Sequence, residues 1–141
     1  MRAVETAQSD VTLPPDPSAS WRARRFVADW CARRSLDEDS VDTLLLLTAE
    51  LVTNAVLYGR SEVAVSLAAT ARQVRLSVAD ENTRLPQRRD PDPDALNGRG
   101  LLLVEALAER HGIDVSPVGK VVWCDVEVAG SLPGTTRRLS A

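Results

Sequence analysis

The sequence ELVTNAVLYG places an acid and an amide four residues apart, at Glu50 and Asn54. In a helix, residues at this spacing are neighbours on one surface. An amide oxygen suits Mg²⁺, which takes few protein ligands and completes its shell with water and phosphate oxygens. We therefore expect Asn54 to hold Mg²⁺, and Glu50 to act as a general base toward a water or hydroxyl. The alternative is two polar residues on a solvent-exposed helix face.

A second candidate for ligand binding is Asp80, at the end of the alternating sequence QVRLSVAD. A carboxylate at a strand end, beneath an apolar pocket, can accept a hydrogen bond from the exocyclic amine of adenine. The carbonyl that guanine carries at the same edge would be repelled. A hydrogen bond to a charged group contributes about 1.5–3 kcal/mol, which is enough to select the base. An ordinary turn aspartate is the alternative interpretation.

The third candidate is NGRG, residues 97–100, directly before an apolar stretch of helical length. Glycines ahead of a helix let the backbone approach a ligand, and the N–H groups of the first turn then point at an anion. Arg99 could add a charge-assisted contact to a phosphate. A plain helix-entry turn is the alternative. A Rossmann fingerprint is excluded because residue 103 is leucine, and no Gly-Lys-Ser/Thr of a P-loop is present.

Helices and strands must hold these residues in place, and the apolar periodicity predicts which ones. Two helices come first, with serine or aspartate as candidate caps, and an antiparallel hairpin follows. After a long loop over residues 81–100 we expect a third helix and two strands around a turn at Gly119. The first helix is expected from Ser18 or Ser20 to about Arg34, and the second from Asp39 or Ser40 to Gly59. The strands of the hairpin are expected at 63–69 and 74–78, and the third helix at 101–112.

This order of elements predicts an α+β two-layer sandwich, in which a mostly antiparallel sheet carries helices on one face. A length of 141 residues favours one domain, which we place at 18–128. Residues 1–17 are expected to be a flexible or extended lead-in because prolines at 14, 15 and 17 block a helix. Residues 129–141 are expected to be a flexible tail.

Composition narrows the class of protein. The net charge of −3 argues against direct binding of nucleic acid. No apolar run approaches the ~20 residues needed to cross a membrane, and the start has no signal-like apolar core, so we expect a cytoplasmic protein without a membrane contact. Cys31 and Cys124 lack metal-ligand spacing and are expected as buried thiols. His111, before Gly112, is expected as a cation at a helix end.

The order of these motifs resembles the GHKL ATPases, and within them the bacterial anti-sigma-factor serine/threonine kinases. ELVTNAV resembles the N box of that family, VADENTRLP its G1 box, and GRGLLLVEALAERHG its G2 box with the helix that follows. WRARRFVADW and GKVVWCDV resemble its opening helix and closing strand. The resemblance covers residues 13–128 and implies a Bergerat-type ATP-binding fold.

The resemblance also implies roles for single residues in binding ATP and Mg²⁺. Glu50 corresponds to the general base, Asn54 to the magnesium ligand and Asp80 to the carboxylate that contacts adenine. Residues 83–97 correspond to a lid over the nucleotide. The remaining residues implied to bind the nucleotide are Asn82, Gly98, Arg99, Gly100 and Leu101.

The implied activity is transfer of the γ-phosphate of ATP to a serine or threonine of an anti-anti-sigma factor. The resemblance also implies that the protein, as a homodimer, sequesters a sigma factor, either in addition to phosphoryl transfer or instead of it. One alternative is a regulator without catalytic activity that binds a partner, with ATP as a structural ligand or absent. A histidine kinase fragment is disfavoured because the only histidine, His111, is poorly suited as a phosphoacceptor.

Four positions depart from the family pattern. Asn82 stands where the G1 box commonly has glycine, and asparagine tolerates unusual backbone angles better than most residues. Tyr58 replaces a histidine that many relatives have after the N box. Val121 and Val122 replace threonines near the phosphates, which removes a hydrogen bond to the nucleotide. The valines and Asn82 favour the alternative without catalysis.

Overall fold

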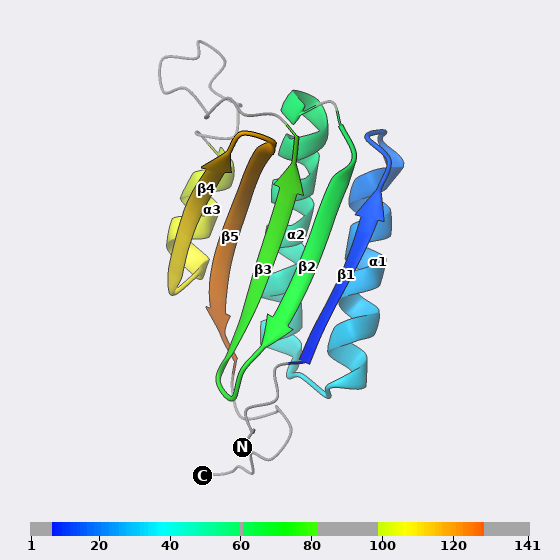
Figure 1. The fold of residues 1–141 in the computed structure, drawn as a ribbon. Helices are drawn as coiled ribbons and strands as arrows, with labels where there is room; N and C mark the ends of the chain where they lie inside the picture. Colours follow the sequence, from blue (N-terminus) through cyan, green and yellow to red (C-terminus); the bar gives the residue numbers. More distant parts are fainter. Residues whose placement is uncertain (1–6, 60, 82–98, 129–141) are drawn as a thin grey trace, which may run out of the picture.

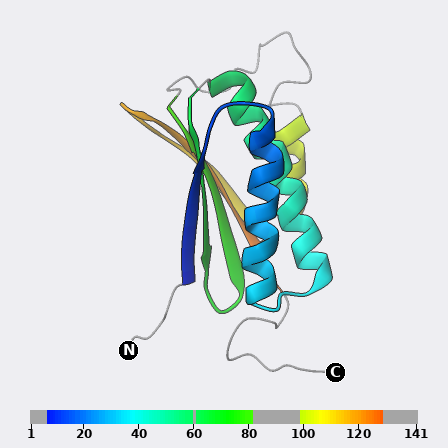
Figure 2. The same cartoon turned by 90° about the vertical axis from the view of Figure 1, so that its right-hand side faces the viewer.

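The computed structural model describes residues 7–59, 61–81 and 99–128. Its strands form one five-stranded antiparallel sheet of order β1-β2-β3-β5-β4. Figures 1 and 2 show the helices packed on one face of this sheet, which confirms the predicted α+β two-layer sandwich. The elements are β1 (Ala7–Leu13), α1 (Ser18–Arg33), α2 (Glu38–Gly59), β2 (Val63–Ala69), β3 (Gln73–Asp80), α3 (Arg99–Leu107), β4 (Arg110–Ser116) and β5 (Gly119–Glu127).

The central strands alternate between a buried face and a half-buried one, as their sequences predicted. The register pairs Val65 with Val78 and Leu67 with Leu76, so that apolar side chains of neighbouring strands lie together under the helices. All four are buried, with exposed fractions of 2% or less. The face turned away from the helices carries small or polar residues at the intervening positions.

Helix α2 lies at the centre of the helical layer and packs against α1, α3 and the sheet. By length and composition alone, residues 38–57 could cross a membrane. In this fold the apolar side of the helix forms the core instead, because Leu44, Leu47, Leu51 and Val52 recur at helical spacing and are all buried. Their burial accounts for the apolar composition of the helix.

Neither of the two long helices begins with the cap that the sequence predicted, and Pro17 is the N-cap of α1. The carboxylate of Asp37 accepts the Ser40 backbone N–H at 3.1 Å and its hydroxyl at 2.6 Å, so Asp37 caps α2 in place of Asp39 or Ser40. At α1, Asp16 accepts the backbone N–H of Ser18 at 2.8 Å. Both carboxylates precede their helix, where they satisfy N–H groups without an intrahelical partner.

Part of the lead-in forms an edge strand. Residues 7–13 pair with β2 along their whole length, from Ala7 opposite Ala69 to Leu13 opposite Val63. Leu13 anchors this strand in the core at 4% exposure. The extended conformation is therefore observed for these residues, while the tail at 129–141 lies outside the described part of the chain.

The third helix is shorter than predicted, and a strand takes its last residues. Helix α3 ends at Leu107, and β4 begins at Arg110, so His111 lies exposed in a strand and the prediction of a helix-end cation was wrong. The reason is cross-strand packing: His111 pairs with Cys124, and Gly112 lies against the indole ring of Trp123. The predicted buried thiols are confirmed, since Cys31 and Cys124 are both buried and free.

Candidate functional site

The described parts of the three predicted stretches lie at one end of the molecule. Figure 1 shows the C-terminal ends of α2 and β3 at the same edge as the start of β5 and the first turn of α3. Helix α2 packs against β3, β5 and α3, so it forms the middle of this end. We call it the candidate-site end and define it by Asn54, Asp80, Lys120 and the first turn of α3.

Asn54 is inside the domain and not on a solvent face. The residue is only 7% exposed, and its Nδ2 donates a hydrogen bond to the backbone carbonyl of Glu50 at 2.8 Å. This contact orients the amide and uses its nitrogen, which leaves Oδ1 with the lone pairs that a hard cation needs. Glu50 itself is half-buried one turn earlier. The donor chemistry at Asn54 therefore fits Mg²⁺.

A metal at Asn54 would depend on the ligand for most of its shell. Within residues 7–59, 61–81 and 99–128, no group of three or more His, Cys, Asp or Glu side chains is arranged to hold a metal ion. Mg²⁺ commonly takes one or two protein ligands with phosphate oxygens and water. A single amide oxygen next to a triphosphate agrees with that pattern.

Asp80 is buried, and it forms an ion pair with Lys120 that the sequence did not predict. The register places Lys120 directly opposite Asp80, and Nζ lies 3.2 Å from Oδ1 and 3.1 Å from Oδ2. The side chains are only 6% (Lys120) and 3% (Asp80) exposed. The strand-end carboxylate thus has a cation beside it. Only the pairing of β3 with β5 could have revealed this, because the two residues are 40 positions apart.

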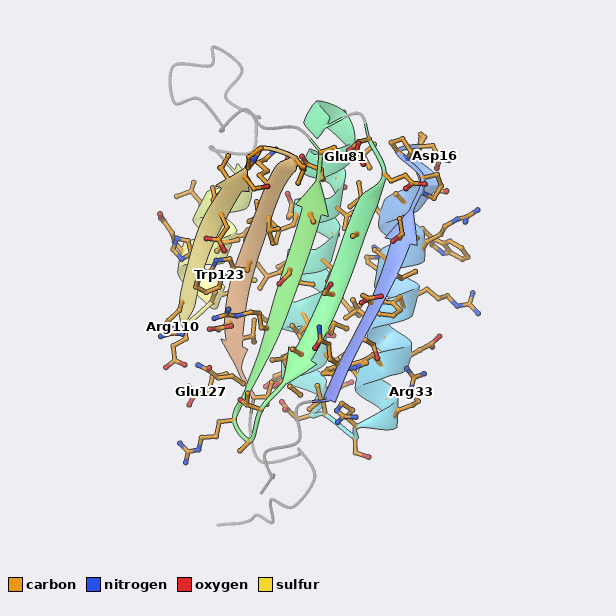
Figure 3. All side chains as sticks on the ribbon, viewed as in Figure 1. Asp16, Arg33, Glu81, Arg110, Trp123 and Glu127 are labelled. Carbon is orange, nitrogen blue, oxygen red and sulfur yellow. The ribbon has the colours of Figure 1, made fainter. Side chains whose placement is uncertain are left out.

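Two backbone contacts fix this strand end. Gly119 has φ +155°, and a Cβ built on it would lie 2.1 Å from the carbonyl oxygen of Asp80, so only glycine allows the approach. On the other side, the Glu81 N–H donates to Oγ of Ser61 at 2.9 Å, which ties the exit of β3 to the segment after α2. Figure 3 shows Glu81 at this edge of the sheet. The position of Asp80 is therefore set from both neighbouring segments.

Helix α3 contributes backbone groups to the candidate-site end. Arg99, Gly100 and Leu101 form its first turn, whose N–H groups have no intrahelical carbonyl to bind. Val104 is fully buried and anchors the helix against the core. Asn82, Gly98 and the predicted lid at 83–97 lie outside the described residues, as do the side chains of Arg99 and Leu101.

The valines that replace threonines have a structural reason. Val122 is 6% exposed and pairs with Val78, so its side chain belongs to the core beneath the helices. Val121 is half-buried and pairs with Ala79. A hydroxyl at position 122 would need a hydrogen-bond partner inside an apolar core.

A groove of about 460 Å³ lies between α1 and α2, outside the predicted site. Trp21, 55% exposed, and Leu46, 43% exposed, give it an apolar surface. The guanidinium of Arg25 lies 5.5 Å from the centroid of the Trp21 ring. The remaining lining residues are Arg24, Ala28, Leu45 and Ala49.

Comparison with known proteins gives a family match over most of the chain. The profile of the histidine kinase-like ATPase domain matches residues 13–125. No curated protein sequence matches.

Solved structures share the fold. The RsbU and RsbW domains of Rv1364c from Mycobacterium tuberculosis superpose with a TM-score of 0.71 at 20% identity, covering 96% of this chain and 35% of that one. This chain therefore spans about a third of the mycobacterial chain. The histidine kinase domain from the Erythrobacter litoralis EL346 blue-light activated histidine kinase gives a TM-score of 0.50 at 17% identity, covering 84% of this chain and 66% of the other.

Proposed function

This chain belongs to the histidine kinase-like ATPase family, and on that premise we propose that it is an ATP-binding protein serine/threonine kinase of the anti-sigma-factor type. It would pass the γ-phosphate of ATP to a hydroxyl of an anti-anti-sigma factor, and sequester a sigma factor. The observation that carries the proposal is the gathering of Asn54, Asp80 and the first turn of α3 at one end of the molecule. The similarity to a structure that contains an RsbW domain supports it.

Each of these groups has a distinct task in the proposed reaction. Asp80 accepts a hydrogen bond from the amine of the purine, while the N–H groups at the start of α3 donate to phosphate oxygens. Asn54 would hold Mg²⁺ through Oδ1, and the bound ion would supply charge neutralisation. Glu50 accepts the proton of the attacking serine or threonine hydroxyl. Catalysis then rests on positioning and electrostatic stabilisation, as phosphoryl transfer generally does.

The decisive experiment is phosphoryl transfer with an Asn54 variant. Purified protein is mixed with labelled ATP, Mg²⁺ and a candidate anti-anti-sigma factor, and label on the partner is counted. We expect Asn54→Ala to lower Mg²⁺-dependent transfer at least about a hundredfold, since one electrostatic contact at a transferring phosphoryl group commonly contributes that much. Thr53→Ala is the matched control, because Thr53 is the exposed neighbour on the same helix.

Two results would contradict this assignment. Full Mg²⁺-dependent transfer by Asn54→Ala removes the metal role of Asn54. Label that never reaches a partner hydroxyl, although ATP binds in calorimetry, removes the kinase activity and leaves ATP as a structural ligand.

A second candidate function is a regulator that holds a partner without catalysis, and the groove between α1 and α2 favours it. An exposed tryptophan beside an apolar pocket is the usual centre of a protein interface. Within the described part of the chain, Arg24 and Arg25 have no ion pair, although the whole protein carries a net charge of −3. The occupant that matches is an acidic amphipathic helix of a partner protein, with apolar residues toward Trp21 and carboxylates toward the arginines.

A labelled model peptide tests this groove. A helical peptide with leucines on one face and glutamates on its flanks should bind the protein, as measured by fluorescence anisotropy. Changing Trp21→Ala together with Arg24→Glu should weaken binding at least about tenfold, because it removes an aromatic anchor and reverses a charge. Arg33→Glu, at the far end of α1, should leave binding unchanged (Figure 3). Equal binding by all three proteins would exclude this groove.

A further inference from the structure

The ion pair between Asp80 and Lys120 lies where the base of the nucleotide is expected. Both side chains are buried, and they face each other across β3 and β5 with Nζ within 3.2 Å of both carboxylate oxygens. They lie on the helix side of the sheet, because Asp80 follows the same alternation as Val78 and Leu76. The base would therefore meet a carboxylate and an ammonium together.

This arrangement changes what the floor of the site can recognise. A carboxylate alone is only an acceptor, so it favours the 6-amine of adenine and repels the 6-carbonyl of guanine. The ammonium of Lys120 has three N–H donors, which exceeds its two contacts with Asp80. A donor next to an acceptor can bind a carbonyl and a ring N–H side by side, which is the pattern guanine presents at its O6 and N1 edge.

We propose that Lys120 broadens the purine selectivity of this site, so that it binds GTP as well as ATP. With adenine, Asp80 accepts from the 6-amine. With guanine, Lys120 donates to O6 and Asp80 accepts from N1–H. The proposal deepens the function above and rests on it, because it concerns the same nucleotide site.

Gly119 helps to make this pairing possible. Its close approach to the carbonyl of Asp80 brings the first residues of β5 against the last residue of β3. Lys120 follows directly and is opposite Asp80 in register, so its side chain has little freedom to leave the carboxylate. A fixed donor loses less entropy on binding a base than a flexible one.

The test compares ATP and GTP binding to Lys120 variants by calorimetry in Mg²⁺. For the wild type we expect dissociation constants for ATP and GTP that differ by less than about tenfold. Lys120→Met keeps the apolar stem and removes the donor, so GTP binding should weaken relative to ATP by about tenfold to a hundredfold, the range of one charged hydrogen bond. Lys120→Arg keeps a donor and should keep the wild-type ratio.

A measurement on the wild type protects the test against a variant that does not fold. ITP keeps O6 and N1–H of guanine but lacks its 2-amine, so it should bind as GTP does if O6 is the group recognised. A triphosphate of 2-aminopurine keeps the 2-amine but lacks O6 and N1–H, so it should bind more weakly than GTP.

The possible outcomes distinguish failure of this inference from failure of the proposed ATP-binding function. Wild-type protein that binds ATP but rejects GTP and ITP overturns the role of Lys120 and leaves the ATP site intact. A GTP-to-ATP ratio that does not change in Lys120→Met overturns it as well. Protein that binds none of these nucleotides overturns both the inference and the proposed function.

Discussion

Two ion pairs join the same two strands, and they differ in what surrounds them. Asp80 pairs with Lys120 and Arg75 pairs with Asp125, each directly across β3 and β5. The first pair lies under the helices at the candidate-site end, and the second lies on the open face of the sheet, because Asp80 and Arg75 have opposite places in the alternation of β3. Their neighbours decide which of them is suited to meet a ligand.

The pair of Arg75 and Asp125, here the outer pair, is fully engaged in contacts within the sheet. Arg75 donates to both oxygens of Asp125, from Nε at 2.7 Å and from Nη2 at 2.9 Å, and Arg110 approaches the same carboxylate at 3.5 Å. The guanidinium also lies 4.0 Å from the centroid of the Trp123 ring, on the open face shown in Figure 3. Gly112 leaves the room that this ring occupies. These contacts brace β3, β4 and β5 together.

In the pair of Asp80 and Lys120, here the inner pair, the cation is a compact ammonium, placed where the end of α2, the start of α3 and the ends of β3 and β5 meet. An ammonium has rotatable donors and can share them, whereas a guanidinium held at both ends of its fork is fixed. The same pairing across two strands holds a sheet together in one place and, in our proposal, recognises a ligand in another. The surrounding elements make the difference.

The largest effect should come from Gly119→Ala, which disturbs the backbone next to the pair of Asp80 and Lys120. Its Cβ would lie 2.1 Å from the Asp80 carbonyl oxygen at φ +155°, so the start of β5 must move. We expect a loss of about 3 kcal/mol or more in the free energy of unfolding, measured in urea, together with loss of ATP binding.

Gly112→Ala is the matched substitution next to the pair of Arg75 and Asp125. There the clash is with the Trp123 side chain at 2.7 Å, which can rotate away, so the loss should be smaller and ATP binding should remain. Equal effects of the two substitutions would mean that the close approach at Gly119 has no special role.

Lys120→Met should come next, because it removes the ammonium that pairs with the buried carboxylate of Asp80. Removing one partner of a buried pair typically destabilises a protein by about 3–5 kcal/mol, and we expect the lower end because the site is at an edge of the sheet. Chemical denaturation without nucleotide measures this. The double variant Lys120→Met with Asp80→Asn should recover part of the loss, and failure to recover any would show that the ion pair is not the cause.

The smallest effect should come from Asp125→Asn, and it should depend on pH. The hydrogen bond from Arg75 lowers the pKa of the Asp125 carboxyl below its usual range. The unfolded chain therefore takes up this proton at higher pH than the folded one, so the pair stabilises the fold above the ordinary pKa of aspartate, about 3.9, and the benefit is lost as pH falls through the lowered value.

We expect Asp125→Asn to cost about 1 kcal/mol at pH 7, since Arg75 is 42% exposed and screened by solvent. The difference from wild type in urea denaturation should shrink below about pH 4. A difference that stays constant down to pH 3 would contradict the assignment to this carboxyl. ATP binding should not change, in contrast to the inner pair.

The sequence by itself determined the elements whose apolar pattern is local. Alternation in 63–69 and 73–80 fixed two strands, and helical spacing from Leu44 to Ala55 fixed α2 with Asn54 on it. These patterns report which side of an element is buried, and each is complete within one segment. They were sufficient for the fold class and for the helix and the strand that carry Asn54 and Asp80.

Only the tertiary structure decided the partners that come from distant segments. A strand before Gly119 was predicted, but its start at Arg110 was not, because β4 has no alternating burial. Its first residues form a strand because they pair with β5 and because Gly112 fits against Trp123. Lys120 meets Asp80 for the same reason: register joins residues that no local pattern connects. Periodicity encodes a buried face, but the choice of partner on that face depends on cross-strand hydrogen bonds and packing, which exist only once the sheet has formed.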